Sequence, residues 1–301
     1  MFFAIICSKI KLQASGNCGT DISWTFESNI LTISGTGEMD SAILLPWSGY
    51  LSQTTKIVIT TGVTSIRDFA FKGSTVAVAE LPDTLLSIQT CAFEDCASLT
   101  RITIPNSVTT IEYSAFQNCA ALEEVILGTA LNEVGSYAFS ECPLLQSFTI
   151  ENNADFCTLD GVLYNKAQTI LIVFPGAKTS ITFPSTITKI EQDAFFGCVG
   201  LTTITIPNTM TTLTGKSIRG LPNLESIKIP KSVTSIEAAA FYDCPKLKTL
   251  EYCGNQNPGD DTSFDGTPLL TRVIINTPPP HFRNKPDTPT FLSNLKDLLI
   301  V

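Results

Sequence analysis

Apolar residues recur in a fixed order along the chain, and the stretch 99–119 shows that order in full. In 99–104 the last apolar residues alternate with polar ones, which predicts a strand, and Pro105 ends it because proline cannot donate to a ladder. The β-branched residues of 108–111 predict a second short strand, and a compact turn follows. The side chains expected to point inward are Leu99, Ile102, Ile104, Val108, Ile111, Ala115, Phe116 and Cys119.

This unit recurs with an almost constant step, as the phenylalanine of its turn shows. The numbering advances by 23 from Phe93 to Phe116 and again from Phe116 to Phe139. We name this place the Phe position; its members are Phe71, Phe93, Phe116, Phe139, Phe195, Ile218, Phe241 and Phe264. The first step is 22, and the step from Phe139 to Phe195 is 56, which is 23 plus an insertion of 33. Self-similarity with a period of about 23 residues predicts a mostly β solenoid in which copies of one unit stack on each other.

Residues 1–56 precede the repeats and predict an N-terminal capping unit. Short β-type segments surround Trp24 and precede Trp47. The first coil of a solenoid has an exposed apolar face and needs an atypical cap, so we expect both tryptophans to pack in its core. The apolar start of the chain precedes Lys9 and Lys11, the reverse of the usual signal-peptide order. A remnant of a signal peptide and a frayed end or first cap strand both remain open.

The repeat region is predicted to span 57–275, with an insert at 155–183. Asp160-Gly161 lies between apolar runs, which is a strong β-hairpin signal. The apolar run 169–174 extends this into a meander that keeps the solenoid in register. Residues 276–301 read as a Pro-rich tail and an incomplete terminal strand, from which we expect a missing cap or self-association through the open strand.

Five of the ten cysteines occupy one place in the repeat, three residues after the Phe position; they are Cys96, Cys119, Cys142, Cys198 and Cys244. Equivalent residues of a parallel stack lie about 4.8 Å apart with parallel side chains. A disulfide needs Cβ atoms about 3.8 Å apart and tilted together, so buried thiols are expected instead. No Cys-x-x-Cys pair predicts zinc or redox chemistry.

Composition and charge exclude several classes of binding partner. The net charge of −9 argues against nucleic acid, which requires clustered Lys and Arg, and against an anionic membrane surface. No apolar run approaches the length of a membrane-spanning helix, so no membrane insertion is expected. We therefore expect proteins or glycans as partners.

Catalytic chemistry finds little support in the sequence. The one histidine, His281, lies in a Pro-rich run, which excludes multi-His metal sites. Glu123 and Glu124 are adjacent on a predicted strand and point to opposite faces, so they cannot form a facing acid–base pair. Asp260 and Asp261 read as a solvated turn, and no phosphate-binding glycine loop occurs. We expect no enzyme activity, no cofactor and no metal.

These motifs together resemble the BspA-type leucine-rich-repeat proteins, also called the Treponema-type repeat. The resemblance rests on the Ile-Pro-Asn-Ser-Val-Thr-Thr-Ile run at 104–111, the similar run at 229–236, the Ala-Phe-x-x-Cys motifs and the Gly35-Thr36-Gly37 leader segment. It implies a right-handed leucine-rich-repeat solenoid and a cell-surface or secreted protein that adheres to host proteins or other cells. It implies no catalytic centre.

We place the ligand surface on strand positions seven, eight and ten residues past the Phe position, between the inward Leu and Ile. These residues are Thr100, Arg101, Thr103, Glu123, Glu124, Ile126, Gln146, Ser147, Thr149, Thr202, Thr203, Thr205, Glu225, Ser226, Lys228, Lys248, Thr249, Glu251, Thr271, Arg272 and Ile274. Such parallel ladders suit a weak, repetitive contact governed by avidity. Two alternatives stay open: threonine selected for β-propensity alone, and a structural assembly scaffold, intracellular and without a dedicated ligand.

Overall fold

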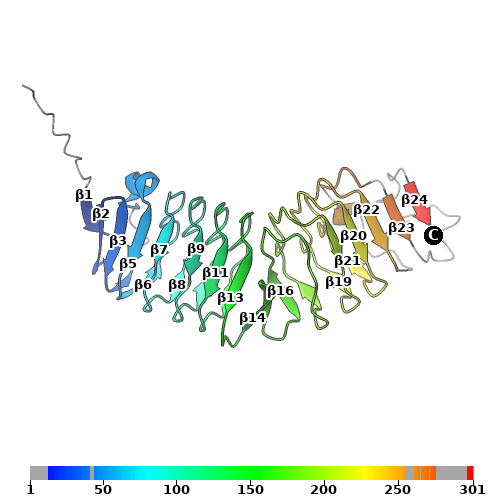
Figure 1. The fold of residues 1–301 in the computed structure, drawn as a ribbon, viewed down its shortest axis with the longest axis horizontal. Helices are drawn as coiled ribbons and strands as arrows, with labels where there is room; N and C mark the ends of the chain where they lie inside the picture. Colours follow the sequence, from blue (N-terminus) through cyan, green and yellow to red (C-terminus); the bar gives the residue numbers. More distant parts are fainter. Residues whose placement is uncertain are drawn as a thin grey trace, which may run out of the picture.

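The computed structural model describes residues 13–40, 44–254, 261–264, 266–270, 272–275 and 297–300. Within them the chain forms an elongated, arched solenoid with β1 near one end and β24 near the other (Figure 1). The predicted leucine-rich-repeat fold is confirmed. Of the predicted ligand residues, Thr271 lies outside the described residues, and only the backbone of Arg272 and Ile274 is described.

Each repeat contributes one longer strand to the face that we call the strand face. Parallel pairing joins these strands across most successive repeats, so that equivalent residues lie side by side. The strands are β5 (Lys56–Ile59), β7 (Val78–Glu80), β9 (Arg101–Thr103), β11 (Glu124–Leu127), β13 (Ser147–Ile150), β18 (Thr203–Thr205), β20 (Ser226–Ile229), β22 (Thr249–Tyr252), β23 (Arg272–Ile275) and β24 (Asp297–Ile300).

A second, shorter strand follows in most repeats, after the proline or turn residue that ends the first. These strands are β4 (Gly37–Glu38), β6 (Val63–Ile66), β8 (Ser87–Ile88), β10 (Thr110–Ile111), β12 (Glu133–Val134), β17 (Lys189–Ile190), β19 (Thr212–Leu213) and β21 (Ser235–Ile236). A compact turn then carries the Phe position back to the next first strand; we call this edge of the molecule the turn side.

The Phe position forms a buried column of rings. Phe93 and Phe116 stack with ring centroids 5.1 Å apart, and Phe116 and Phe139 with centroids 5.2 Å apart. Their interplanar angles are 4° and 1°, because the parallel register gives each ring the same orientation. Ile218, in a degenerate copy, is fully buried at the same place.

The cysteines beside this column are buried thiols with a specific hydrogen bond. Each of the five donates its Sγ–H to the carbonyl oxygen of the Phe position in the preceding turn, as Cys119 does to Phe93 at 3.2 Å. The same bond recurs from Cys96, Cys142, Cys198 and Cys244 at 3.1–3.3 Å. Thus the thiol is both an apolar filler and a donor to a buried carbonyl, a role that the sequence pattern did not reveal.

The N-terminal unit caps the column. β1 (Gln13–Asn17), β2 (Ile22–Glu27) and β3 (Ile30–Gly35) form an antiparallel meander, and β3 pairs in parallel with β5. A 3-10 helix, η1 (Ser48–Gln53), follows Trp47, which stacks on Phe71 at a centroid distance of 6.0 Å. The Trp47 Nε1–H donates to the carbonyl oxygen of Ala70 at 2.7 Å, and Trp24 is also buried. Both tryptophans therefore pack in the core, as expected.

The insert contains the expected meander, but its place in the repeat is more specific than the sequence suggested. β14 (Phe156–Leu159) and β15 (Val162–Asn165) form an antiparallel hairpin that turns at Asp160-Gly161, and β15 continues into β16 (Ile170–Val173). β16 pairs in parallel with β17, so it serves as the second strand of the repeat that begins with β13. Phe174 then acts as the missing Phe position: its carbonyl accepts the Cys198 thiol, and its ring lies 5.1 Å from Phe195.

The later part of the expected insert, 177–183, belongs to the next repeat. Pro184 precedes Pro207 by one full period, and Ile181 and Phe183 pack against the core as Ile204 and Ile206 do. The hairpin is therefore inserted within one repeat, between its first and second strands, and that repeat has a shortened turn.

β15 separates two hydrophobic cores. Leu163 packs with the cluster that runs from the cap to β14, whereas its neighbours Val162 and Tyr164 pack with the cluster that runs to η2 (Asp261–Phe264). Successive residues of a strand point to opposite faces, so one strand can act as a partition between two cores. In Figure 1 the arch bends at this place, around β14 and β16.

Candidate functional site

The predicted ligand residues whose side chains the structure describes all reach the surface of the strand face. Backbone pairing places Arg101 beside Glu124 and Glu124 beside Ser147, and aligns Thr103 with Ile126 and Thr149. In the second half Thr203, Ser226 and Thr249 form one row, and Thr205, Lys228 and Glu251 form the next. Thr100, Glu123, Gln146, Thr202, Glu225 and Lys248 lie one residue before the strands and are exposed. The predicted geometry is therefore present; its use for binding stays a prediction.

Charged residues of the strand face pair with one another across neighbouring strands. Arg101 Nη1 lies 3.4 Å from Glu124 Oε2, and Lys248 Nζ lies 3.7 Å from Glu225 Oε1. Lys228 Nζ lies 2.6 Å from Glu251 Oε1, and this hydrogen bond raises the pKa of Lys228. Exposed ion pairs of this kind add little to stability, because water and salt screen them. Their main effect is to fix alternating charge along the face.

The strand face extends further than the sequence count indicated. Lys56 and Glu80 continue it on β5 and β7, where their side chains form an ion pair at 2.6 Å. Val78 is exposed beside them. Beyond the hairpin, Thr179, Ser180 and Thr182 stand one period before Thr202, Thr203 and Thr205 and are also exposed. The full-period spacing from Pro184 to Pro207 was the signal that would have found them.

The hairpin interrupts the strand face and leaves a broad hollow of about 670 Å³. Its lining consists of Gln146, Ser147, Asp160, Gly161, Ala177 and Lys178. Phe148 donates its backbone N–H to the carbonyl oxygen of Gly161, at the hairpin tip, at 2.8 Å. Lys178 Nζ lies 3.1 Å from Asp160 Oδ2 across the hollow. Two of the predicted ligand residues, Gln146 and Ser147, thus line a concave part of the strand face.

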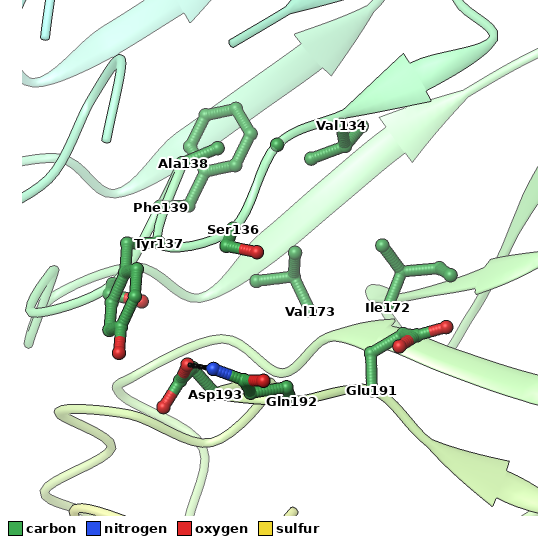
Figure 2. Close-up of a pocket in the computed structure, with 12 residues that line it drawn as sticks. Val134, Ser136, Tyr137, Ala138, Phe139, Ile172, Val173, Glu191, Gln192 and Asp193 are labelled. Atoms are coloured by element: carbon green, nitrogen blue, oxygen red, sulfur yellow. Dashed lines mark hydrogen bonds between the residues drawn. The ribbon is translucent and has the colours of Figure 1, made fainter. Parts of the chain in front are cut away.

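The shortened turn leaves a smaller cavity of about 110 Å³ on the other side of the same repeat. Figure 2 shows Tyr137 and Phe139 on one wall, with Gln192 and Asp193 opposite them. The Asp193 carboxyl is completely buried; it accepts from Arg219 Nη1 at 3.0 Å and from Gln192 Nε2 at 2.9 Å. Arg219 also donates to the Tyr137 hydroxyl. Burial, and then the nearby Asp193, raise the pKa of Tyr137.

Aromatic side chains gather around Arg219 on the turn side. Its guanidinium lies 4.7 Å from the Phe196 ring centroid and 5.4 Å from that of Tyr242. Tyr137 meets Phe196 edge-on at 5.5 Å and meets Tyr113 at the same distance. The sequence analysis did not find this cluster, although Phe196, Arg219 and Tyr242 each follow the Phe position by one residue.

The described residues offer little for catalysis. They include no group of three His, Cys, Asp or Glu side chains that could hold a metal ion. Glu123 and Glu124 both reach the surface, contrary to the expected opposite orientation, because the strand begins only at Glu124; Glu124 is paired with Arg101. His281 and Asp260 lie outside the described residues. Burial raises the pKa of the Cys96 thiol to about 12 and that of Cys244 to about 11, so these thiols stay protonated and unreactive at neutral pH. Among the described helices none is both long and apolar enough to cross a membrane.

Three solved structures of bacterial proteins are similar to this chain. A leucine-rich repeat protein from Eubacterium ventriosum has 25% identity and a TM-score of 0.69, with 88% of this chain and 79% of that chain covered. The pneumococcal vaccine antigen PcpA has 20% identity and a TM-score of 0.59, covering 96% and 88%. A leucine rich cell surface protein from Faecalibacterium prausnitzii has 19% identity and a TM-score of 0.56, covering 96% and 94%.

The similarity to the latter two structures, at 20% and 19% identity, shows a shared fold. No curated protein matches the chain significantly. The profile of the BspA type leucine rich repeat region matches six copies, over residues 50–160 and 176–284. The gap between the two matched ranges holds β15 and β16, and together the ranges cover well over half of the sequence. The chain belongs to the BspA-type leucine-rich-repeat family.

Proposed function

We propose that this protein is a non-catalytic, adhesin-like binding module, on the cell surface or secreted, whose strand face contacts extended proteins or glycans. The observation that supports it most is the strand face itself. Backbone register aligns exposed Thr, Ser, Lys, Arg and Glu side chains into rows on both sides of the hairpin. A repeated array of weak contacts gains affinity by avidity when the ligand is also extended and repetitive.

The pairing of charges on this face favours a partner with alternating charge or many hydroxyl groups. Arg101–Glu124 and Glu225–Lys248 present both signs within one row spacing. Exposed pairs exchange readily with a ligand because they hold each other by about 1 kcal/mol or less. The surface location follows the family and the Faecalibacterium cell surface protein of the same fold.

The decisive variant replaces Arg101, Glu124, Glu225 and Lys248 together with alanine. It removes both members of two ion pairs, so net charge is unchanged and neither pair leaves a former partner behind. We expect an unchanged circular-dichroism melt and loss of capture on arrays of host extracellular proteins and glycans. The matched control replaces Lys231, Lys246, Asp83 and Glu133, which are exposed away from the strand face. Capture that survives in the folded quadruple variant contradicts the strand face as the site.

The scaffold alternative has a separate outcome. It predicts no capture by the intact chain in any array position, together with concentration-dependent self-association in light scattering. An intact chain that is captured and stays monomeric excludes it.

A further inference from the structure

We propose that the turn side carries a second binding surface, which takes a basic, extended peptide segment of a partner protein. The surface has two parts. The aromatic strip consists of Tyr113, Tyr137, Phe196 and Tyr242 with Arg219, and the acidic hollow adjoins it at Phe196. The inference rests on the proposed role of the chain as a binding module and names the chemistry of one partner.

The aromatic strip is a continuous, partly exposed shelf. Rings or the guanidinium lie 4.7–5.5 Å from the next member all along it, from Tyr113 to Tyr242. Tyr113 is 51% exposed and Tyr242 is 43% exposed, although the column of rings directly beneath is fully buried. Large aromatic side chains clustered at a surface, with arginine, are the residues that dominate protein interfaces. The aromatic strip thus has the anchors that the predicted residues of the strand face lack.

The insertion in the repeat that begins with β13 brings the members of the aromatic strip together. The shortened turn around Phe174 lets the turn at Tyr137 meet the turn at Phe196 directly. Glu141 donates its backbone N–H to the carbonyl oxygen of Phe196 at 3.3 Å across this junction. Arg219 then reaches back over Phe196 to the Tyr137 hydroxyl.

The sign of the partner's charge follows from how Arg219 is used. Its guanidinium is paired with the buried Asp193 and lies between the rings of Phe196 and Tyr242. The charge of Arg219 is therefore neutralised within the protein, and its guanidinium is held in place as part of the aromatic strip. An acidic partner would have to compete with Asp193, whose carboxylate has no access to water in its place.

The acidic hollow offers the complementary charge. It has a volume of about 180 Å³ and is lined by Glu141, Phe196, Gly197, Gly220, Pro222, Asp243 and Pro245. Glu141 and Asp243 are both exposed, and the lining within the described residues includes no basic residue, in a chain of net charge −9. Glu141 Oε2 accepts from the neutral amide of Gln117 at 2.7 Å, so its charge is not neutralised by that contact. Its glycine floor is required, because a Cβ on Gly220 would lie 2.2 Å from Phe196 Cδ2. A lysine or arginine side chain entering here would meet carboxylates at its head and an aromatic face along its stem.

The occupant is accordingly a segment with basic residues between apolar or proline residues. Proline-rich segments dock on aromatic-lined grooves because their extended helix is pre-formed and loses little entropy. As a probe we choose the acetylated, amidated heptapeptide Pro-Arg-Pro-Arg-Pro-Arg-Pro. Its matched control has citrulline in place of arginine, which keeps the shape and removes the charge.

The tyrosines of the chain allow a direct readout. Of its six tyrosines, Tyr113, Tyr137 and Tyr242 belong to the aromatic strip, while Tyr50, Tyr164 and Tyr252 lie in the cap or the core. Full-length protein labelled with 3-fluorotyrosine should show shifts of the three strip resonances on titration with the arginine peptide, with the other three unmoved. The citrulline peptide should give no saturable shift. Absence of shifts with the arginine peptide, or equal shifts with citrulline, overturns the proposal.

Substitutions then separate this surface from the strand face. Glu141→Gln with Asp243→Asn keeps side-chain shape and should weaken the arginine peptide by about tenfold or more, as loss of close charge pairs does. The control, Glu124→Gln with Glu225→Gln, removes the same charge from the strand face and should leave peptide binding unchanged. An equal loss in both variants means that binding follows net charge and contradicts the acidic hollow. If the strand-face variant loses capture but the arginine peptide does not bind the parent, the turn-side proposal alone fails. If the peptide binds but the strand-face variant is still captured, the proposed function of the strand face fails.

Discussion

Glu141 and Phe196 are joined by a backbone hydrogen bond that skips one repeat. Elsewhere the turns bond to the next turn in order, as Asn118 does to Ser140 and Gly197 to Gly220. Between Glu141 and Phe196 lies the repeat that carries the hairpin, and its shortened turn does not intervene. The two flanking stacks therefore remain in phase on the turn side while the strand face opens.

The column at the Phe position should dominate stability. Phe116→Ala removes a fully buried ring that stacks on Phe93 and Phe139. We expect a loss of about 3–5 kcal/mol in the free energy of unfolding, measured by chemical denaturation. Thr103→Ala, at an exposed position of β9, is the control and should change stability by less than about 0.5 kcal/mol. A loss below about 1 kcal/mol for Phe116→Ala would contradict the core assignment.

Alkaline pH should destabilise the protein through its buried thiols. Burial raises the pKa of Cys96 to about 12, against 9.0 for an ordinary thiol, so above pH 9 the unfolded chain releases protons that the folded chain retains. Stability is therefore unaffected by this group below about pH 8 and falls between 9 and 12, by at most about 1.4 kcal/mol per pH unit for each such thiol.

The matched variant for that experiment is Cys96→Ala, which removes the titrating group. Its unfolding free energy should be lower than that of the parent at pH 7, because the hydrogen bond to the Phe71 carbonyl is lost. Its slope between pH 9 and 10.5 should be smaller than that of the parent. Parallel slopes would show that the thiol already ionises in the folded chain. The parent protein, denatured without reductant, should give most of its ten thiols as free groups.

The Arg219–Asp193 pair should show strong coupling. Arg219→Met leaves the fully buried Asp193 carboxylate without its cation, and we expect a loss of about 2–4 kcal/mol, somewhat below that of a fully buried pair because Arg219 is partly exposed. Adding Asp193→Asn should recover part of this loss. A double-mutant cycle by chemical denaturation measures the coupling, and strictly additive losses would mean that the pair is not a stabilising unit.

The N-terminal cap should be needed for solubility. Deletion of residues 1–56 exposes the rings beneath Trp47, beginning with Phe71. Exposed ends of solenoids associate, so we expect aggregation in light scattering. A truncated chain that stays monomeric and melts at the parent temperature would show that residues 1–56 are not a cap.

The sequence predicted the fold because one apolar pattern recurs at a nearly constant period, and few folds other than a solenoid bury such a pattern. Phe93, Phe116 and Phe139 can all be buried only if equivalent turns stack, and the outward positions of the strands follow from alternation. The position of the hairpin within its repeat was harder to predict, since the step from Phe174 to Phe195 is shorter than the period and Phe174 lacks the Ala and Cys of its motif.

The aromatic strip could not be predicted in the same way. Tyr113 and Tyr137 precede the Phe position by three and two residues, whereas Phe196 and Tyr242 follow it by one. These places converge only because the turn at Tyr137 meets the turn at Phe196. The aromatic strip thus depends on the shortened turn around Phe174, which counting by the repeat period does not reveal.

The partition made by β15 has a consequence for how the protein comes apart. A solenoid unfolds cooperatively only when each coil shares a packed hydrophobic interface with the next. Leu163 faces one interior while Val162 and Tyr164 face the other, so a single strand is the main seam between the two blocks. Heating or stretching the chain should then unfold one block while the other stays folded. A bound protein would keep its contacts with the block that is still folded.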